Sequence, residues 1–470
     1  MTKRIGIIGA GPGGYVAAIR AAQLGCAVTL VERDRVGGTC LNRGCIPTKT
    51  LWKSASIAKE ARESEIFGVV TGDVSIDGDQ IIKRKADVVE QVVGGVEYLL
   101  KQYENLNHIT GEATFVDKNK LRITTEEGET EEEFDAIIVA TGSYPTMTET
   151  QGVDLPNVMT SDDLLAMDHI PESMIVVGGG VIGLEFASIY QELGCQVTLL
   201  ASRILKDADM EIRRRLPSYF KKAGMKVYVD VRALQITETE NGLLKVHAKH
   251  KQKDEEYFEE AKVVLIASGR GAVIDVLNLE AVGVEHEASG LKVDENLMTN
   301  VEGIYAIGDV IQGNPQLAHV ASAQGVWLAE YLAGEAEEPN FSIFPACTFT
   351  LPEVSQVGLT ELECKDQGLD YVVSKFQFAA NAKAVSQGEG DGFVKLIADG
   401  NREKILGAHI MGPHASDLIH ECVVAMRTGL TVDELIPVIH AHPTLSEAVM
   451  EAIHGLKDQA VHMAPPRKKR

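Results

Sequence analysis

Cys40 and Cys45, two cysteines with four residues between them, are the side chains whose type and spacing most directly indicate chemistry. On a regular helix, residues five apart are separated by about 7.5 Å of rise and point to different sides. A disulfide requires Cα atoms within about 7 Å and converging side chains, so a bridge here needs a distorted backbone. Gly44 supplies that conformational freedom. Because strained, easily reduced disulfides are typical of catalytic pairs, we predict a redox-active dithiol; the alternative is two unpaired core cysteines.

A second candidate pair, His442 and Glu447, lies near the C-terminus. Pro443 and Thr444 predict a helix start, which places Glu447 in the first turns, where it can orient His442 across the turn. A histidine held by a carboxylate is a general base near neutral pH, suited to taking a proton from a thiol. The alternatives are a histidine in a turn and a glutamate that favours a helix N-terminus.

The segment before the cysteines has the pattern of a dinucleotide-binding module. A short apolar strand leads to Gly9, Gly11 and Gly14, a helix follows as far as Gln23, and a second strand ends at Glu32. Such glycines let the backbone approach a pyrophosphate, and the helix N-terminus stabilises its charge. The acid at the end of the second strand can hold the adenosine ribose hydroxyls.

The same pattern recurs in the second third of the chain. Gly178, Gly180 and Gly183 each lie 169 positions after their counterparts in the first motif (178 − 9, 180 − 11, 183 − 14). Each module also has a later apolar strand that ends in a glycine turn, at Thr141-Gly142 and at Gly269. We therefore predict two homologous modules that bind two nucleotides, an arrangement suited to electron transfer between cofactors.

The second module departs from the first at the acid. The position equivalent to Glu32 is Ala201, and Ser202 and Arg203 follow it. The second module thus lacks the carboxylate that would bind a ribose 2′-hydroxyl, and Arg203 with Ser202 can instead receive a 2′-phosphate, as in NADP sites. The alternative is that Arg203 is a solvated loop cation and NAD binds without the acid.

Two later segments complete the candidate cofactor site. An apolar strand ends at Gly308-Asp309, where the carboxylate can accept hydrogen bonds from hydroxyls of a ligand crossing the sheet; an ordinary Asp turn is the alternative. Ala318 precedes a helical run over 320–333 and is included among the candidate cofactor-binding residues. Beyond the Gly/Glu/Pro-rich stretch 334–340, a strand-like segment over 392–397 and helical segments near 414–427 and 445–457 predict a separate α+β domain.

The length, charge and composition of the whole chain limit the kinds of protein that it can be. Its 470 residues suggest about three domains, and its formal charge of −23 argues against a nucleic-acid surface. There is no apolar run long enough to span a membrane, and a strand begins within five residues of the N-terminus, which leaves no room for a signal peptide. Seven cysteines, an odd number, fit a cytoplasmic protein with one special pair. We expect the basic tract Arg467–Arg470 to be a mobile tail.

Taken together, the motifs resemble those of the flavoprotein disulfide reductases (pyridine nucleotide-disulfide oxidoreductases), and most closely the dihydrolipoamide dehydrogenase family. The resemblance extends over essentially the whole chain. It is carried by the segments 9–14, 38–49, 140–142, 178–185, 308–309 and 442–447. It implies an α/β fold with two Rossmann-like domains and a C-terminal α+β dimerisation domain. The corresponding divisions are residues 1–146 (FAD, first part), 147–268 (NAD(P)), 269–338 (FAD or central, second part) and 339–470 (dimer interface).

The resemblance also implies cofactors, partners and roles. FAD would bind the first module and NAD, with NADP as the alternative, the second. The working form would be a head-to-tail homodimer in which His442 and Glu447 of one subunit serve the cysteine pair of the other. Asp309 would contact the ribityl-phosphate region of the flavin, and Lys49 would pair with Glu185 near the flavin ring.

In the reaction that the resemblance implies, a dihydrolipoyl group attacks the disulfide at Cys40 after His442 removes a thiol proton. Cys45, the sulfur facing the flavin, passes the electrons on. The dihydrolipoyl group would arrive on a partner, a lipoyl-bearing acyltransferase of a 2-oxo-acid dehydrogenase or related complex. The alternatives are an NADPH-dependent reductase of another small disulfide and a non-catalytic assembly subunit. No cluster has metal-ligand spacing, so we expect no metal site.

Overall fold

The first glycine motif joins the first strand to the first helix of an N-terminal α/β module. We describe a computed structural model, which covers residues 2–464. Five parallel strands form a sheet in the order β20-β7-β1-β2-β3. These strands are β1 (Arg4–Ile8), β2 (Ala27–Glu32), β3 (Leu106–Thr110), β7 (Ala136–Val139) and β20 (Ile304–Ala306). The sheet therefore contains strands from both ends of the first 310 residues.

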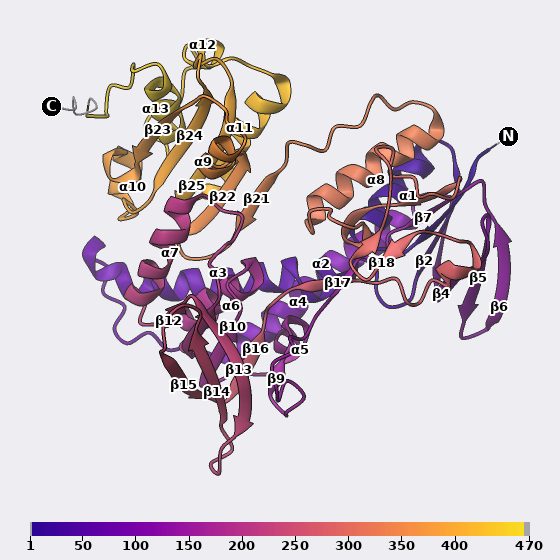
Figure 1. Ribbon diagram of the computed structural model, residues 1–470, viewed down its shortest axis with the longest axis horizontal. Coiled ribbons are helices and arrows are strands. Elements are labelled where there is room, and N and C mark those ends of the chain that lie inside the picture. Colours follow the sequence, from indigo (N-terminus) through magenta and orange to yellow (C-terminus); the bar gives the residue numbers. More distant parts are fainter. Residues whose placement is uncertain (1, 465–470) are drawn as a thin grey trace.

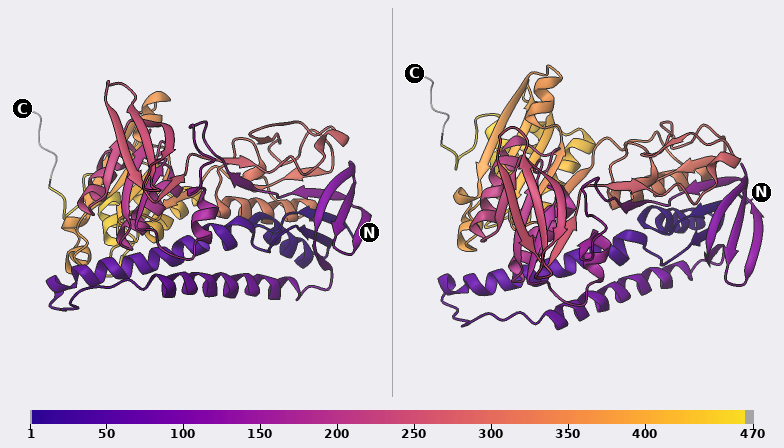
Figure 2. Two further views of the ribbon diagram at one scale, coloured as in Figure 1. Left: turned by 90° about the horizontal axis from the view of Figure 1, so that it is seen from below. Right: turned by 60° about the horizontal axis from the view of Figure 1, so that its bottom comes forward.

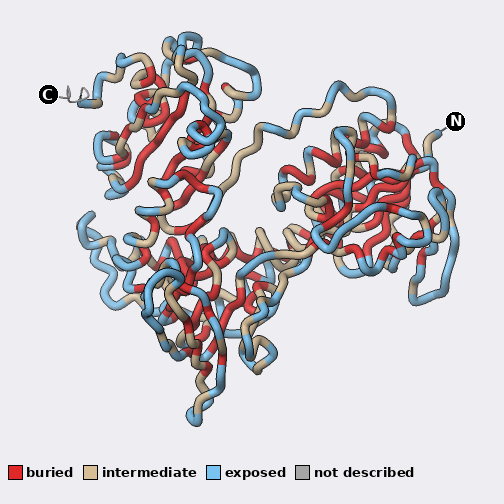
Figure 3. The backbone as a smooth tube through the Cα atoms, viewed as in Figure 1, coloured by how far each residue is buried: buried red, intermediate tan, exposed pale blue. Residues whose placement is uncertain are grey.

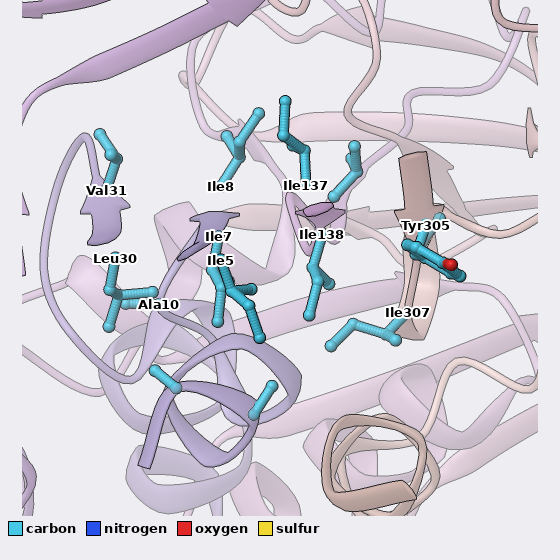
Figure 4. Close-up of a cluster of buried hydrophobic side chains, with 14 of the residues drawn as sticks. Ile5, Ile7, Ile8, Ala10, Leu30, Val31, Ile137, Ile138, Tyr305 and Ile307 are labelled. Atoms are coloured by element: carbon cyan, nitrogen blue, oxygen red, sulfur yellow. The ribbon is translucent and has the colours of Figure 1, made fainter. Parts of the chain in front are cut away.

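Apolar side chains on both faces of this sheet explain why its strands are continuous hydrophobic runs. Figure 4 shows Ile7, Leu30 and Ile138 on the face toward the helices, and Ile8 and Ile137 on the opposite face. Helices α1 (Pro12–Gln23) and α8 (Ala318–Ala333) pack together on the first face. An antiparallel sheet of β4 (Glu112–Asp117), β5 (Lys120–Thr125) and β6 (Gly128–Glu133) belongs to the same module.

The second glycine motif follows strand β10 of a second parallel sheet. The strand order of this sheet is β12-β11-β10-β16-β9. Its strands are β9 (Val158–Met159), β10 (Ser173–Val177), β11 (Gln196–Ala201), β12 (Lys226–Val229) and β16 (Val263–Ile266). The helices of this part of the chain are α5 (Ser161–Ala166), α6 (Val181–Glu192) and α7 (Met210–Lys222). A three-stranded antiparallel sheet adds β13 (Val231–Glu238), β14 (Leu244–His250) and β15 (Glu256–Ala261).

Two long helices and a short two-stranded ribbon join the modules. Helix α3 (Cys45–Glu63) leads away from the first module, and α4 (Gly78–Leu100) returns after the short helix η1 (Ser64–Phe67). Figure 2 shows α3 and α4 side by side along one edge of the molecule. The ribbon pairs β8 (Ser143–Pro145) with β17 (Arg270–Ala272), so the two crossings between the modules lie beside each other.

The C-terminal part forms a third unit, at the upper left of Figure 1. Its antiparallel sheet has the order β21-β22-β25-β24-β23. The strands are β21 (Pro345–Thr348), β22 (Glu353–Gly358), β23 (Tyr371–Gln377), β24 (Phe393–Asp399) and β25 (Ile405–Gly412). The helices are α9 (Glu361–Asp366), α10 (Ala382–Ser386), α11 (Ala415–Thr428), α12 (Val432–Leu435) and α13 (Glu447–Leu456). Short elements in 279–310 are η2 (Leu279–Ala281), β18 (His286–Glu287), β19 (Gly290–Leu291) and η3 (Gly308–Val310), and η4 (Phe378–Ala380) follows β23.

A buried ion pair ties the third unit to the second module. The Lys395 ammonium on β24 contacts the Asp209 carboxylate at 2.8 Å, and these side chains are 4% and 1% exposed. Glu361 also contacts the same ammonium. In Figure 3 the buried residues of each unit follow its central sheet. The buried apolar cluster of the second module continues into the third unit through Val354, Phe393 and Met411. The predicted α/β class, with two dinucleotide-binding modules and a C-terminal α+β unit, is confirmed; the residue boundaries of the domains stay a prediction.

Candidate active site

The helix is interrupted between the two cysteines, as the sequence predicts. Helix α2 (Gly38–Arg43), which carries Cys40, ends one residue before Gly44, and Cys45 begins α3. A Cβ atom on Gly44 would lie 2.9 Å from the carbonyl oxygen of Thr39, so this close approach favours glycine. The break lets the two thiols face each other although five positions separate them.

The two thiols have opposite acidities. A hydrogen bond from the Cys40 thiol to the Cys45 sulfur, together with the nearby Lys49 ammonium, lowers the pKa of Cys45 to about 7, against the opposing effect of burial. The same hydrogen bond, with burial, raises the pKa of Cys40. Both residues are free thiols in this structure. In the dithiol form, the negative charge near neutral pH therefore resides on Cys45, next to the start of helix α3.

Lys49 and Glu185 form the ion pair that the resemblance implies. The Lys49 ammonium lies 3.1 and 2.9 Å from the two carboxylate oxygens of Glu185, whose side chain is only 5% exposed. The backbone N–H of Phe349 donates a third hydrogen bond to Glu185 at 2.9 Å, and the Lys49 ammonium lies 4.5 Å from the centre of the Phe349 ring. Lys49 follows Cys45 by one helical turn, so the pair is held beside the thiols.

The two cysteines line a cavity of about 2100 Å³, and this cavity extends to both glycine motifs. A single small-molecule site usually has about 300–1,000 Å³, so this cavity has room for more than one large ligand. It is lined by all three units, including Pro345 to Phe349 of the C-terminal unit.

The first glycine loop is shaped as a cradle on this cavity. Gly9 has φ +100°, and a Cβ atom there would lie 2.5 Å from the carbonyl oxygen of Ala140. A Cβ on Gly14 would lie 1.8 Å from the carbonyl oxygen of Gly9. The tight strand-to-helix turn therefore requires glycine at this position. Gly11 faces open space, and α1 begins after it without a side-chain cap. The free N–H groups of this helix end suit a pyrophosphate.

Glu32 fixes the same loop from the neighbouring strand. Its carboxylate accepts hydrogen bonds from the backbone N–H groups of Ala10 at 2.7 Å and Asp34 at 2.9 Å. Burial raises the pKa of Glu32, and the hydrogen bond from Ala10 opposes that shift. A carboxylate has about four acceptor sites, so two contacts leave capacity for hydroxyl groups of a ligand in the cavity.

Asp309 belongs to a polar chain that crosses between the modules. Its carboxylate accepts a hydrogen bond from the Ser143 hydroxyl at 2.6 Å, and the Arg270 guanidinium donates to that hydroxyl at 2.8 Å. Burial raises the pKa of Asp309, while Ser143 and Arg270 lower it. On the same connection, the Thr141 hydroxyl donates to the carbonyl oxygen of Val273 at 2.7 Å.

The second glycine loop repeats the geometry of the first. Gly178 has φ +139°, and a Cβ atom there would lie 2.2 Å from the carbonyl oxygen of Ala267. A Cβ on Gly183 would lie 2.5 Å from the carbonyl oxygen of Gly178, and Gly180 precedes α6 with open space beside it. Ala201 is fully buried, whereas Arg203 is exposed and lines the cavity.

The histidine–glutamate pair forms, but the local structure differs from the prediction. The His442 Nδ1 and Glu447 Oε1 atoms are 2.9 Å apart, and the other Glu447 oxygen accepts the backbone N–H of Thr444 at 2.8 Å. The prediction of a helix start at Pro443 and Thr444 was wrong, because α13 begins at Glu447 and the preceding residues form a turn. Although burial raises the pKa of Glu447, the Thr444 N–H and His442 lower it overall.

Most of the predicted site residues meet at one cavity. Those that line it are Gly9, Gly11, Glu32, Cys40, Cys45, Lys49, Thr141, Gly142, Gly178, Gly180, Glu185, Arg203, Gly269, Asp309 and Ala318. Gly14 and Gly183 lie inside the turns just behind it. His442 and Glu447 do not line it; the His442 side chain is 72% exposed on the C-terminal unit.

Sequence reasoning missed several residues of the site. Ser143 and Arg270 each directly follow a glycine turn that was singled out, and that adjacency is the signal that would have found them. Phe349 and Lys251 also line the cavity, but they come from the C-terminal unit and from the residue after β14. Nothing in their local sequence indicates a site, because only the packing of distant segments brings them there.

Comparison with known proteins identifies the family. A family model described as pyridine nucleotide-disulphide oxidoreductase matches residues 3–325, and the model of the corresponding dimerisation domain matches residues 344–453. The chain belongs to the pyridine nucleotide-disulphide oxidoreductase family. It is 42% identical to a dihydrolipoyl dehydrogenase of Halobacterium salinarum and 40% identical to one of Bacillus subtilis. The alignments cover 97% of this chain and 97% and 98% of those proteins.

Solved structures of this family agree with that assignment. The chain is similar to LpdA of Mycobacterium tuberculosis, with a TM-score of 0.88 and 29% identity over 97% of this chain and all of that one. It is also similar to RclA of Escherichia coli, a HOCl-induced flavoprotein disulfide reductase, with a TM-score of 0.85 and 28% identity over 96% and 99% of the two chains. The protein is therefore an oxidoreductase, an FAD-dependent disulfide oxidoreductase with a C-terminal dimerisation domain that supports a homodimer.

The dihydrolipoyl dehydrogenases to which this chain is similar use FAD and NAD, and the two glycine cradles fit two dinucleotides. The first cradle, with the cysteine pair and the Asp309 chain beside it, fits FAD. Within residues 2–464, no group of three or more His, Cys, Asp or Glu side chains is placed to hold a metal ion. The helices of the same residues include none that is both long and apolar enough to cross a membrane. The basic tract at the C-terminus lies outside the described residues.

Proposed function

We propose that this chain is a dihydrolipoyl dehydrogenase, which oxidises dihydrolipoyl groups and delivers the electrons to a nicotinamide nucleotide. The observation that carries the proposal is the thiol pair at the helix break, in which Cys45 has a pKa of about 7 and lies beside the Lys49–Glu185 ion pair. This pair faces the cavity that both glycine loops share. When bound there, FAD and the nicotinamide nucleotide accept and carry away the electron pair.

In the proposed reaction, Cys40 is the sulfur that meets substrate. A dihydrolipoyl thiolate attacks Cys40 of the oxidised pair, the bond between the two cysteine sulfurs breaks, and Cys45 leaves as a thiolate. The second lipoyl thiol, once deprotonated, attacks the lipoyl sulfur of the mixed disulfide and expels Cys40. The lipoyl group is thereby oxidised to its cyclic disulfide, and the cysteine pair gains two electrons. The lowered pKa of Cys45 suits a leaving group, because a more acidic thiol leaves faster.

The proton acceptor in this scheme is His442 of the partner subunit. Within one chain the His442 side chain is largely exposed and the pair does not line the cavity, yet its geometry is that of an oriented base. The contact between His442 and Glu447 fixes the imidazole through Nδ1, which leaves Nε2 for the thiol proton. The match of residues 344–453 to a dimerisation domain supports a second copy as the source of this base.

The substrate of this scheme is a dihydrolipoyl group carried by a lipoyl-bearing acyltransferase of a 2-oxo-acid dehydrogenase or related complex. The names of the similar proteins from Halobacterium and Bacillus support this choice. A cytoplasmic location follows from the same proposal, because the catalytic pair must cycle through its dithiol form and a reducing compartment permits this.

The test measures nicotinamide reduction by free dihydrolipoamide, with low-molecular-weight disulfides and NADPH as the competing substrates. We expect efficient turnover with dihydrolipoamide, loss of turnover in Cys40→Ser, and retention in Cys364→Ala, which removes a buried thiol of the C-terminal unit. Turnover with another small disulfide but not with dihydrolipoamide would instead support the alternative reductase. A purified protein that binds no flavin would support the assembly-subunit alternative and exclude both enzymes.

A further inference from the structure

The end of strand β11 in the second module differs from its counterpart in the first. In the first module, Glu32 accepts the backbone N–H of Ala10 in the glycine loop at 2.7 Å. The corresponding loop residue of the second module is Gly179, and the residue corresponding to Glu32 is Ala201. Ala201 is fully buried and brings no carboxylate to this loop. The second loop therefore lacks the acceptor that binds ribose hydroxyls and that would repel a phosphate at the same place.

The main chain after β11 also returns to the glycine loop, but it does so one residue sooner: Leu205 lies four residues after Ala201, whereas Gly37 lies five after Glu32. The backbone N–H of Gly37 donates to the carbonyl oxygen of Ala10 at 2.8 Å, and that of Leu205 donates to the carbonyl oxygen of Gly179 at 2.8 Å. A Cβ atom on Gly179 would lie 2.0 Å from the carbonyl oxygen of Arg203, so the segment after Ala201 packs directly against the loop. The Arg203 backbone therefore lies against the second glycine loop, and its side chain lines the cavity.

Cations replace the missing acid around this position. Arg203 and Lys206 come from the segment after β11, Arg232 from β13, and Lys251 from the residue after β14; all line the cavity and are exposed. The Lys251 ammonium donates to the carbonyl oxygen of Ser202 at 2.9 Å, which holds this cation beside the same segment.

Two carboxylates of the surrounding segments also line the cavity, those of Asp207 and Glu149. The Asp207 carboxylate lies 4.0 Å from the Lys206 ammonium and is 80% exposed. Against four cations, these two acids leave the rim positive. In a chain with a formal charge of −23, a positive rim at the adenosine end of one module is a specific feature of that module.

We propose that the second module binds 2′-phosphorylated adenine dinucleotides in preference to the unphosphorylated form, with Arg203 and Lys251 as the phosphate-binding side chains. An arginine fork and an ammonium suit a phosphate, and hydrogen bonds between charged groups are the stronger kind. The inference rests on the proposed placement of a nicotinamide nucleotide in this module. It assigns to this chain the NADP(H) type of acceptor, while the thiol chemistry stays as proposed above.

The test is equilibrium binding to the FAD-loaded enzyme by calorimetry, without turnover. The probes are 2′,5′-ADP and 5′-ADP, which differ only in the 2′-phosphate. We expect 2′,5′-ADP to bind at least about tenfold more tightly than 5′-ADP. Arg203→Ala and Lys251→Ala should each weaken 2′,5′-ADP by about tenfold and leave 5′-ADP nearly unchanged. Lys253→Ala, a change of an exposed lysine in the same hairpin that does not line the cavity, is the matched control and should bind both probes as the unmodified protein does.

A further variant adds a side chain instead of removing one, so its result does not depend on the loss of a contact. Ala201→Glu restores the acid of the first module and should reverse the preference toward 5′-ADP. Equal affinity of the unmodified protein for both probes would overturn the inference and leave the dithiol oxidation intact. Failure of both probes to bind would overturn the inference together with the nucleotide assignment of the second module.

Discussion

The hydrogen bond between the two active-site thiols is predicted to set the acidity of Cys45, and a pair of substitutions at position 40 isolates it. Cys40→Ala removes the donor, whereas Cys40→Ser keeps a hydroxyl at nearly the same place. In the unmodified dithiol the pKa of Cys45 is about 7, and the Cys40 thiol is the largest cause of that lowering. We therefore expect the alanine variant, and not the serine variant, to lose the acidity of Cys45.

The magnitude follows from the strength of a hydrogen bond to a charged group, about 1.5–3 kcal/mol. One pKa unit corresponds to about 1.4 kcal/mol, so the pKa of Cys45 should rise by about one to two units in Cys40→Ala. Because its folded-state pKa is lowered, Cys45 is mainly thiolate above pH 7 and mainly thiol below it. At pH 7 the thiolate fraction should fall from about one half to about 1–10% in the alanine variant.

The assay is the pH dependence of alkylation at Cys45, followed by mass spectrometry of its peptide. Since the thiolate is the nucleophile, the alkylation rate at pH 7 should fall about five- to fiftyfold in Cys40→Ala. The rate in Cys40→Ser should stay within about twofold of a thiolate with a pKa near 7. Equal midpoints in the two variants, or a midpoint near 7 in the alanine variant, would refute the assignment of the acidity to this hydrogen bond.

The same geometry predicts the outcome of four other changes. Lys49→Met leaves the carboxylate of Glu185, which is 5% exposed, without its cation; we expect the free energy of unfolding in urea to fall by about 1–3 kcal/mol. Ser143→Ala removes the hydroxyl at the centre of the polar chain between the modules, so flavin should dissociate about fivefold faster, measured by the fluorescence of released flavin. His442→Gln removes the proposed base, so turnover should fall by about 10²–10⁴-fold. Glu447→Gln should lower turnover less, because it leaves the imidazole in place.

The following results would contradict these predictions. Unchanged stability in Lys49→Met would show that Glu185 is satisfied by its backbone contact alone. Flavin release at the original rate in Ser143→Ala would remove this hydroxyl from the support of the flavin site. Turnover in His442→Gln at the rate of the unmodified enzyme would contradict a histidine base.

The parts of the fold that could be predicted from the sequence are those in which local chemistry dictates structure. The glycine loops are recognisable because only glycine tolerates the positive φ of Gly9 and Gly178 and their contacts with the next strand. The apolar strands beside them are recognisable because both faces of a parallel sheet are buried. Gly44 was recognisable for a similar reason, since two cysteines five positions apart cannot meet on an unbroken helix.

Features that depend on long-range packing could not be predicted in this way. The start of α13 was misplaced because Glu447 bonds back to the Thr444 N–H, so the turn before it looks like a helix entry in sequence. Lys251 reaches Ser202, in the segment after β11, only because β14 brings its end to that edge of the module. Even the link from Ser143 to Asp309 joins residues 166 positions apart, and no local pattern reports such a contact.

The most direct test of the thiol–flavin relay is the visible spectrum of the enzyme during anaerobic titration with dihydrolipoamide. If the Cys45 thiolate lies against the flavin, a long-wavelength thiolate-to-flavin band should grow as the pair is reduced. It should be absent from Cys45→Ser, and later addition of the nicotinamide nucleotide should remove it from the unmodified enzyme. A band that survives in Cys45→Ser, or reduction of the pair without any such band, would contradict the account.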